Sequence, residues 1–419
     1  MSSLIIEICK VDKIEPHPQA DRMAIATIKG WKTCVRKNED GTTQFNEGDL
    51  CIFVPPDAIL PKDLSDKLGV TNYLKQLGKK ADGTRPDGGR VAVSRLRGQP
   101  SYGFITNLDV LNSFYTGHGE QPVWKLGDDV ADLMGITKWE PPISCTDGDA
   151  ERPHPAFHRY FDLENYRNFP DLIPEGEPVV FTEKLHGKNC RLGYIRDNGP
   201  TGTMEMTWMA GSHDVRRKES VTRKRKNYDK ETKELKVEEY QDKSQFWQCL
   251  DKPGIRDLMH GLSTGYGDAD ELMKTISTGE VDVSNKNVVV FGEIFGSGVQ
   301  DMTYGMEAGA WDFRVFDITV NGKYVPAAIK YDWCKRYGVQ TVPVLYDGPF
   351  SSAKVEEYVT GETTVCSSEK AGVFKGREGI VITAKEEKSV TTEKKVFDRL
   401  ALKAINFDYL ERKGGTEFH

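Results

Sequence analysis

The stretch VVFTEKLHG, residues 179–187, decides the fold prediction for this chain. Its first half is apolar, as in a buried strand, and it ends in charged residues closed by Gly187. Lys184 therefore stands where a strand meets a glycine turn, and glycine lets a backbone approach a ligand closely. A lysine taken alone is usually a solvated charge, so it is this setting that makes Lys184 a candidate for chemistry.

Comparable apolar segments follow Lys184 and indicate a region of mixed helix and strand that begins near residue 160. They lie at residues 191–196, 205–211, 287–296, 313–320 and 378–384. A segment rich in Lys and Arg, residues 216–236, interrupts them, and a helix is predicted over residues 246–259. We interpret the basic segment as a solvated loop, with binding of a phosphate backbone as the alternative.

The N-terminal region has a different pattern, with short strands separated by turns and almost no helical periodicity. These strands are predicted at residues 4–11, 24–36, 49–56, 90–98 and 102–108. We predict an OB-like β-barrel that binds nucleic acid over residues 1–120. Residues 121–155 are rich in Gly, Pro and Asp and are predicted to be a linker, which leaves residues 156–419 as a further domain.

Length and composition limit the function classes. A chain of 419 residues suggests two or three domains at roughly 150 residues each. The net charge is -7, so any surface for nucleic acid must be local. The 8 cysteines show no zinc-ligand spacing, and neither a signal peptide nor an apolar span of membrane length is present. We therefore expect an intracellular protein, cytoplasmic or nuclear, without membrane contact.

Five segments in order resemble the motifs of the lysine-adenylating nucleotidyltransferases, the superfamily of DNA ligases, RNA ligases and mRNA-capping enzymes. The first motif, K-x-(D/H)-G, is matched by Lys184-Leu-His186-Gly187. The other matches are FGEIFG (291–296), FRVFDI (313–318), EGIVI (378–382) and ALKAIN (401–406). The resemblance implies an α+β fold, in which a nucleotidyltransferase core of packed antiparallel sheets with flanking helices is preceded by the OB-like β-barrel.

The resemblance also implies roles for single residues, with Lys184 as the catalytic nucleophile. A deprotonated lysine amine would attack the α-phosphate of ATP, beside the nucleotide-binding His186 and Gly187. Glu293 and Glu378 would bind Mg²⁺ or Mn²⁺ through water. The remaining nucleotide-binding candidates are Lys403 at the α-phosphate, Phe313 under the adenine with Phe316 as its alternative, Arg191, and Arg167 upstream of the site.

Two positions depart from the superfamily pattern. His186 stands where many members have aspartate, although histidine is familiar there among RNA ligases. The fifth motif often has two lysines one residue apart, whereas Ala401 occupies the first of these places. Arg399 or Lys395 is a candidate to supply the missing cation.

The position of the OB-like barrel before the core makes the chain resemble ATP-dependent RNA ligases. We therefore predict an enzyme that joins 3′-hydroxyl and 5′-phosphate ends through a lysyl-AMP and an adenylylated 5′-phosphate, in RNA repair. Its partners would be RNA ends or a nicked duplex containing RNA, and we expect a monomer. The alternatives are a capping-type guanylyltransferase that uses GTP and a noncatalytic OB-fold RNA-binding protein.

Overall fold

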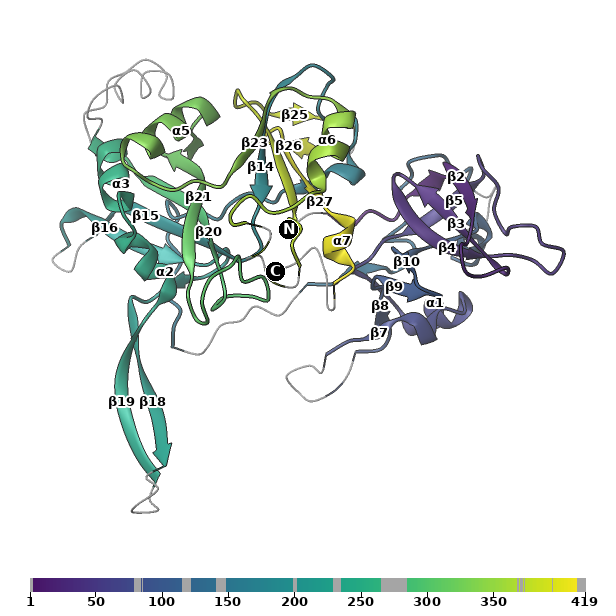
Figure 1. Ribbon diagram of the computed structural model, residues 1–419, viewed down its shortest axis with the longest axis horizontal. Coiled ribbons are helices and arrows are strands. Elements are labelled where there is room, and N and C mark those ends of the chain that lie inside the picture. Colours follow the sequence, from purple (N-terminus) through teal and green to yellow (C-terminus); the bar gives the residue numbers. More distant parts are fainter. Residues whose placement is uncertain are drawn as a thin grey trace. The chain divides into compact units, whose positions relative to one another are not determined.

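The chain divides into two compact units that contain helices and antiparallel sheets (Figure 1). The first unit comprises Met1–Pro142, Glu164–Pro170 and Phe407–His419, and the second comprises Ile143–Leu163 and Asp171–Asn406. The computed structural model describes residues 3–78, 84, 86–114, 122–140, 148–198, 202–228, 235–264, 285–367, 369, 372, 374–393 and 395–412. No helix within these ranges has the length and apolar character needed to cross a membrane.

The first unit consists of short strands and a few helical turns. Its strands are β1 (Ile8–Lys10), β2 (Lys13–Pro16), β3 (Met23–Ile28), β4 (Trp31–Arg36), β5 (Leu50–Val54), β6 (Ala58–Leu60), β7 (Lys75–Gln76), β8 (Gly89–Arg90), β9 (Ser94–Leu96), β10 (Gln99–Ser101), β11 (Phe104–Thr106), β12 (Thr137–Lys138) and β13 (Glu164–Asn165). Its helices are α1 (Lys62–Lys67), α7 (Phe407–Leu410) and the 3₁₀ turns η1 (Thr71–Tyr73), η2 (Leu108–Ser113) and η3 (Tyr166–Asn168).

Strand β4 shows why these segments pair into sheets with one covered face. Trp31, Thr33 and Val35 are buried, while the residues between them are more exposed, which is the period of a half-buried strand. β4 pairs with β3 and β3 with β2, while β1, β5 and β11 form a second sheet. The segment predicted to be a linker supplies Val130, Met134 and Ile136 to the buried core of this unit.

The second unit contains two larger antiparallel sheets. One runs β27-β24-β14-β23 and the other β17-β16-β15-β20-β21-β22. The strands are β14 (Pro178–Lys184), β15 (Lys188–Asn198), β16 (Met204–Gly211), β17 (Arg216–Arg217), β18 (Ser220–Tyr228), β19 (Leu235–Lys243), β20 (Val288–Phe295), β21 (Asp312–Val320), β22 (Lys323–Tyr324), β23 (Val344–Pro349), β24 (Gly379–Ala384), β25 (Val390–Thr391), β26 (Val396–Phe397) and β27 (Ala401–Ile405). The helical elements are α2 (Gln245–Gln248), η4 (Cys249–Asp251), α3 (Ile255–Thr264), α5 (Ala327–Arg336) and α6 (Ser352–Val359).

The apolar run of β20 reflects cover on both faces of the six-stranded sheet. Val288, Val290 and Ile294 pack in a core with residues of α3 and α5, and Val289 and Phe291 pack in a second core that contains Phe157 and Tyr160. Such two-sided burial replaces the apolar and polar alternation of an exposed sheet.

Two predictions in this unit are wrong. The helix expected over residues 246–259 is interrupted between η4 and α3, because Pro253 cannot continue it and Gly254 adopts φ +74°. Within the described residues, the basic segment expected to be a loop instead forms β17, β18 and the first two residues of β19. The β18–β19 hairpin projects from the body of the unit (Figure 1). Cross-strand charge pairs such as Lys224–Glu239 stabilise strand pairing in so polar a sequence.

Candidate active site

A cavity of about 130 Å³ lies in the second unit, and strands of both large sheets line it. β14 and β24 supply one side, and β15, β20, β21 and helix α5 supply the other. The lining side chains are Tyr160, Leu163, Val180, Thr182, Glu183, Lys184, Leu185, Asn189, Glu293, Phe316, Asp317, Ala327, Lys330, Tyr331, Val342, Val381 and Thr383. Lysine, carboxylates and apolar surface thus meet in one hollow, as expected of a site for a small polar ligand.

Lys184, which lines this cavity, forms an ion pair with Glu378. Lys184 ends β14 and pairs with Gly379 at the start of β24, so Glu378 lies at the same end of the sheet. The distance from Lys184 Nζ to Glu378 Oε1 is 2.6 Å. Glu378 is 1% exposed, and its Oε2 is buried without a hydrogen-bond partner among the described residues. A buried carboxylate oxygen of this kind is suited to a cation or a bound water.

Glu293 and Asn189 face one another across β20 and β15 and also line the cavity. Burial raises the pKa of Glu293 to about 8; the Lys184 ammonium opposes this shift and the Glu378 carboxylate adds to it. Asn189 Oδ1 is a second buried oxygen without a hydrogen-bond partner within the described ranges. Sequence reasoning missed Asn189, because the register that pairs β15 with β20 and sets Asn189 opposite Glu293 is visible only in the structure.

The Leu-His-Gly turn after Lys184 is held by hydrogen bonds on both sides. The His186 backbone N–H donates to Tyr304 Oη at 2.7 Å, and His186 Nε2 lies 2.6 Å from Asp301 Oδ1. The His186 ring is fully buried. The Gly187 carbonyl accepts a hydrogen bond from Gln300 Nε2 at 3.1 Å. The imidazole therefore fixes the turn through Asp301 rather than lining the cavity.

Gly187 is required because β20 passes directly over it. A Cβ at Gly187 would lie 2.1 Å from the Ile294 carbonyl oxygen and 3.0 Å from Cγ of Glu293. Gly187→Ala is therefore expected to push β20 away and lower the free energy of unfolding by about 1–3 kcal/mol. Denaturant titration would check this, with Gly78→Ala as control because a Cβ there meets nothing within 4 Å. Equal unfolding midpoints for the two variants would refute the close approach.

Phe316 lines the cavity, whereas the predicted Phe313 does not appear among the described lining residues. Phe313 is 3% exposed and packs over Gly292 in the core beneath the helices. The register of β20 with β21 shifts between Phe291 and Gly292. Val315 and Asp317 pair with β20 there, so Phe316 is the extra residue of a bulge. Alternation places Phe316 and Phe313 on opposite faces of the sheet, but it does not tell which face borders the cavity.

The other predicted nucleotide-binding residues are Lys403, Arg191 and Arg167, and they lie in different parts of the structure. Lys403 is buried on β27 and pairs with Val381, so it lies on the sheet face that borders the cavity. Arg191 donates to the carbonyls of Ser212 and Phe157 at 2.9 and 2.6 Å, and burial lowers the pKa of Arg191 to about 10. Arg167 belongs to the first unit, where its guanidinium lies 4.1 Å from the centroid of the Phe407 ring.

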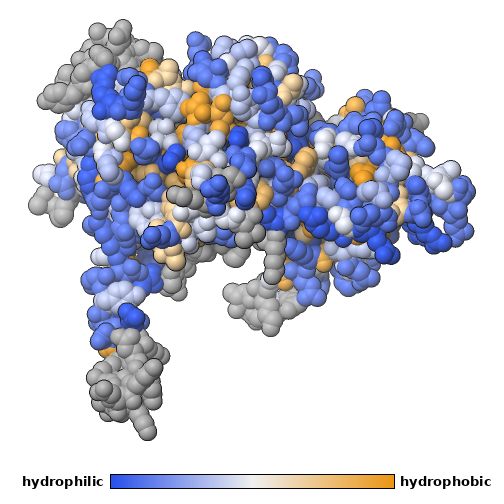
Figure 2. All heavy atoms as spheres, in the orientation of Figure 1, coloured by the Kyte–Doolittle hydropathy of each residue, from blue (hydrophilic) through white to orange (hydrophobic). Residues whose placement is uncertain are grey.

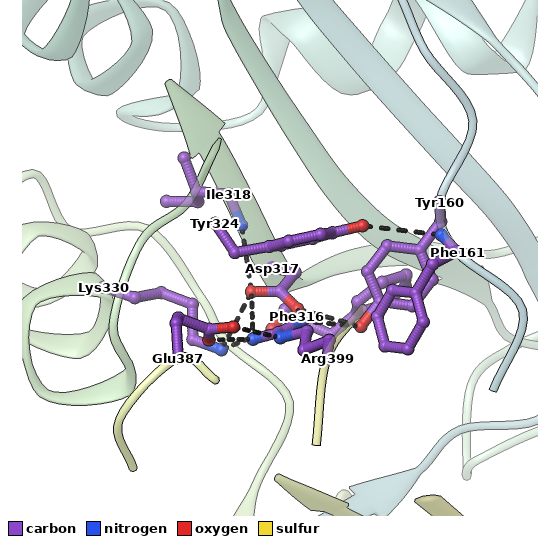
Figure 3. A network of polar contacts seen from close by, with 9 residues as sticks. All are labelled: Tyr160, Phe161, Phe316, Asp317, Ile318, Tyr324, Lys330, Glu387 and Arg399. Carbon is purple, nitrogen blue, oxygen red and sulfur yellow. Dashed lines mark hydrogen bonds and ion pairs between the residues drawn. The ribbon is translucent and has the colours of Figure 1, made fainter. Parts of the chain in front are cut away.

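Arg399, considered as a substitute for the missing lysine, belongs to a buried network (Figure 3). It pairs with Asp317 and makes two 2.6 Å hydrogen bonds to Glu387. Tyr160 donates to Asp317 at 2.8 Å, and Lys330 Nζ lies 3.4 Å from Asp317 Oδ1. These carboxylates satisfy Arg399, so the network secures β21 and its Phe316 instead of presenting a phosphate-binding cation.

The carboxylates suit a divalent cation that also binds phosphate. Within the part of the chain that the structure describes, no group of three or more His, Cys, Asp or Glu side chains could hold a metal. Mg²⁺, however, is commonly bound by one or two carboxylates together with substrate phosphates and water. Glu378 Oε2, Glu293 and Asn189 Oδ1 provide hard oxygen donors for such a cation. The residues present therefore fit Mg²⁺ or Mn²⁺.

Comparisons with known proteins agree with this geometry. A family model described as RNA ligase matches residues 177–405, and an OB-fold domain model matches residues 5–108. A search of curated proteins finds no match. Among solved structures, an apo variant of a Naegleria gruberi RNA ligase aligns with a TM-score of 0.65 and 20% identity, covering 98% of this chain and 99% of that chain. Another variant, with ATP and Mn, aligns with a TM-score of 0.64 and 21% identity, covering 99% and 100%. The predicted fold class, a nucleotidyltransferase core preceded by an OB domain, is confirmed.

Proposed function

The chain belongs to the RNA ligase family, and from this premise we propose that it uses ATP to join RNA 3′-hydroxyl and 5′-phosphate ends through a lysyl-AMP on Lys184. The observation that carries the proposal is the Lys184 amine in a cavity beside Glu378 and Glu293. The solved Naegleria gruberi RNA ligases with ATP or AMP and Mn support the choice of nucleotide and of a divalent cation.

Three transfers account for the reaction. The neutral Lys184 amine attacks the α-phosphorus of ATP, so that an N–P bond forms and pyrophosphate leaves. An oxygen of the RNA 5′-phosphate then displaces the lysine and takes the AMP. Finally the 3′-hydroxyl attacks the activated phosphate, and AMP leaves with the electrons of the broken P–O bond. Each transfer occurs at a phosphorus that the same cavity would hold.

Glu378 would have two roles in the first transfer. In the nucleotide-free site it pairs with the Lys184 ammonium and so favours the protonated lysine. A divalent cation held by Glu378, Glu293 and Asn189 would neutralise phosphate charge and favour the neutral amine. Lys403, on the cavity face of β27, would contact the α-phosphate.

The apolar end of the cavity would hold the base. We propose Phe316, in place of Phe313, as the ring that stacks on adenine, with Val381 on the facing sheet. His186 and Gly187 would shape the turn that presents Lys184. Arg191 would fix the start of β15 through its carbonyl partners, and a contact of Arg167 with the nucleotide stays a prediction.

We extend the proposal to the domain organisation, the RNA substrates and the oligomeric state. Residues 1–120 would act as the OB-like RNA-binding domain, 121–155 as its connection, and 156–419 as the adenylation domain. We propose RNA ends or nicked duplexes containing RNA as substrates, RNA repair as the task, and a monomer as the working form. The thiols of Cys9, Cys51 and Cys190 are unpaired, in keeping with a reducing cytoplasmic or nuclear setting.

Glu378→Gln keeps the shape of the side chain but removes its charge. We expect self-adenylation at a fixed Mn²⁺ concentration to fall about 10- to 100-fold, because the cation loses a carboxylate ligand. A titration with Mn²⁺ would show the half-maximal concentration moving upward. Glu386→Gln, an exposed neighbour on the same segment, serves as control. An unchanged Mn²⁺ dependence in Glu378→Gln would contradict the proposed cation site.

One experiment tests the function as a whole. The full-length protein is incubated with Mn²⁺ and ATP or GTP labelled on the α-phosphate, and label retained on the polypeptide through denaturing electrophoresis is measured. We expect label from ATP and release of that label as AMP when 5′-phosphorylated RNA is added. Label from GTP alone would instead indicate a capping-type guanylyltransferase, and no label from either nucleotide would indicate a noncatalytic RNA-binding protein.

A further inference from the structure

A second hollow, of about 570 Å³, lies in the second unit at the base of the β18–β19 hairpin. Its volume falls in the range of clefts that hold small ligands or parts of larger ones. Its lining residues are Asp149, Lys188, Arg217, Lys218, Val221, Arg223, Asp242, Lys243, Ser244, Gln245, Phe246, Gln248, Gly298, Gly309 and Trp311. We call this hollow the hairpin cleft.

Positive charge predominates in the hairpin cleft, where five cationic side chains accompany two carboxylates. Arg223 pairs with both of those carboxylates, Asp149 at 3.1 Å and Asp242 at 2.6 Å. Lys188 and Lys218 are exposed and form no ion pair or hydrogen bond through their ammonium groups with any described residue. The cleft therefore presents uncompensated ammonium groups, which attract the phosphates of a polyanion.

The hairpin cleft and the nucleotide cavity lie on opposite faces of the start of β15. Lys188, the first residue of β15, lines the cleft, and the next residue, Asn189, lines the cavity. Because side chains alternate along a strand, one strand end borders both hollows. Lys188 also follows the turn that begins at Lys184, so a polymer bound in the cleft is held beside the reactive lysine.

Two aromatic rings, Phe246 and Trp311, add apolar surface to the cationic cleft. Both rings are partly buried and pack against the core, so each offers only part of its surface to the cleft. A groove with cations and such rings suits unpaired nucleotides, whose bases stack on aromatic side chains while their phosphates meet the cations. Duplex RNA has a deep, narrow major groove that side chains do not read, which makes a paired segment a poorer fit. The visible face of the hairpin stem next to the cleft is hydrophilic, as a surface facing an RNA backbone would be (Figure 2).

From these observations we propose that the hairpin cleft binds a single-stranded segment of the RNA substrate next to the end that is sealed. The proposal rests on the RNA-joining function given above and names the part of the RNA that this surface recognises. Lys188 and Lys218 contact backbone phosphates, and Phe246 and Trp311 stack with bases.

The test compares two activities of the full-length double variant Lys188→Ala/Lys218→Ala. Binding of a 5′-phosphorylated single-stranded RNA is measured by fluorescence anisotropy over a range of salt concentrations, and self-adenylation from ATP is measured without RNA. Loss of two phosphate contacts is expected to reduce the slope of log affinity against log salt by about 1.4. At 0.1 M salt this corresponds to binding weaker by roughly 10- to 30-fold. Self-adenylation is expected to stay unchanged.

The matched control is Arg196→Ala/Lys335→Ala, which removes the same charge from two exposed residues of the same unit outside the cleft. Equal salt slopes for the two double variants would overturn the proposal. The proposal would also fail if Lys188→Ala/Lys218→Ala lost as much affinity for a blunt RNA duplex as for the single-stranded RNA. A loss of self-adenylation in this variant would overturn it as well, because it would assign the cleft to the triphosphate of ATP. If the unaltered protein fails to self-adenylate, the proposed function fails, and the binding measurements still decide whether the cleft holds RNA.

Discussion

Replacing Lys184 by alanine is expected to abolish covalent labelling of the protein by ATP. No other amine described in the cavity faces both a buried carboxylate pair and an open ligand space, since Lys330 is 4% exposed and donates to the Phe316 carbonyl at 2.7 Å. Nucleophilic catalysis through a covalent intermediate has no substitute when the nucleophile is removed. The loss should exceed about 10³-fold and reach the detection limit of label transfer.

The result is informative only if the variant stays folded and still binds its nucleotide. Removing Lys184 takes the cation away from Glu378, which is 1% exposed, so the unfolding midpoint is expected to fall, and labelling is compared at a temperature below that midpoint. The variant should also seal RNA that already carries an adenylylated 5′-phosphate, because that substrate enters after the lysine has acted. Lys335→Ala, on the exposed side of α5, is the control. Undiminished labelling of Lys184→Ala would place the nucleophile elsewhere.

The central strands of the six-stranded sheet could be predicted closely from the sequence, because β20 is buried on both faces and is a continuous apolar run. The segments expected at 287–296 and 313–320 are β20 (Val288–Phe295) and β21 (Asp312–Val320). The hairpin β18–β19 was missed for a physical reason. Its strands are charged on both faces and are held by main-chain pairing and cross-strand charge pairs, which leave no apolar period.

Candidate site residues could be predicted from the sequence where the residue type has a fixed chemical task. They could not be predicted where the role of a side chain depends on its three-dimensional surroundings. The motif resemblance predicted the grouping of Lys184 with Glu293 and Glu378, and in the structure Glu293 lines the cavity with Lys184 while Glu378 pairs with the Lys184 amine. The preference for Phe316 over Phe313 depends on which face of β21 borders the cavity, and alternation along the strand does not report that. The use of Arg399 depends on which carboxylates surround it, and no sequence spacing reports that Glu387 and Asp317 converge there.

The Arg399 network is expected to be the most costly polar cluster to disturb. Arg399 and Asp317 are each 3% exposed in their side chains. Burial raises the pKa of Asp317, but the charges of Arg399 and Lys330 outweigh burial, so the net pKa lies below its usual range. Removing one partner of a buried ion pair leaves an uncompensated charge, which costs far more than losing an exposed pair.

Arg399→Ala should therefore lower the free energy of unfolding by about 3–5 kcal/mol, and Arg399→Lys by less, since lysine keeps the charge but loses the paired contact with Glu387. Lys354→Ala, which breaks an exposed pair with Glu357, should cost far less than Arg399→Ala. Denaturant titrations followed by tryptophan fluorescence would rank the three. Because the pKa of Asp317 is lowered on folding, the contribution of the pair persists above about pH 4 and is lost only as the pH falls through the folded pKa. A penalty for Arg399→Ala no larger than that for Lys354→Ala at pH 7 would show that the network does not hold β21. In that case Phe316 would owe its position to apolar packing alone.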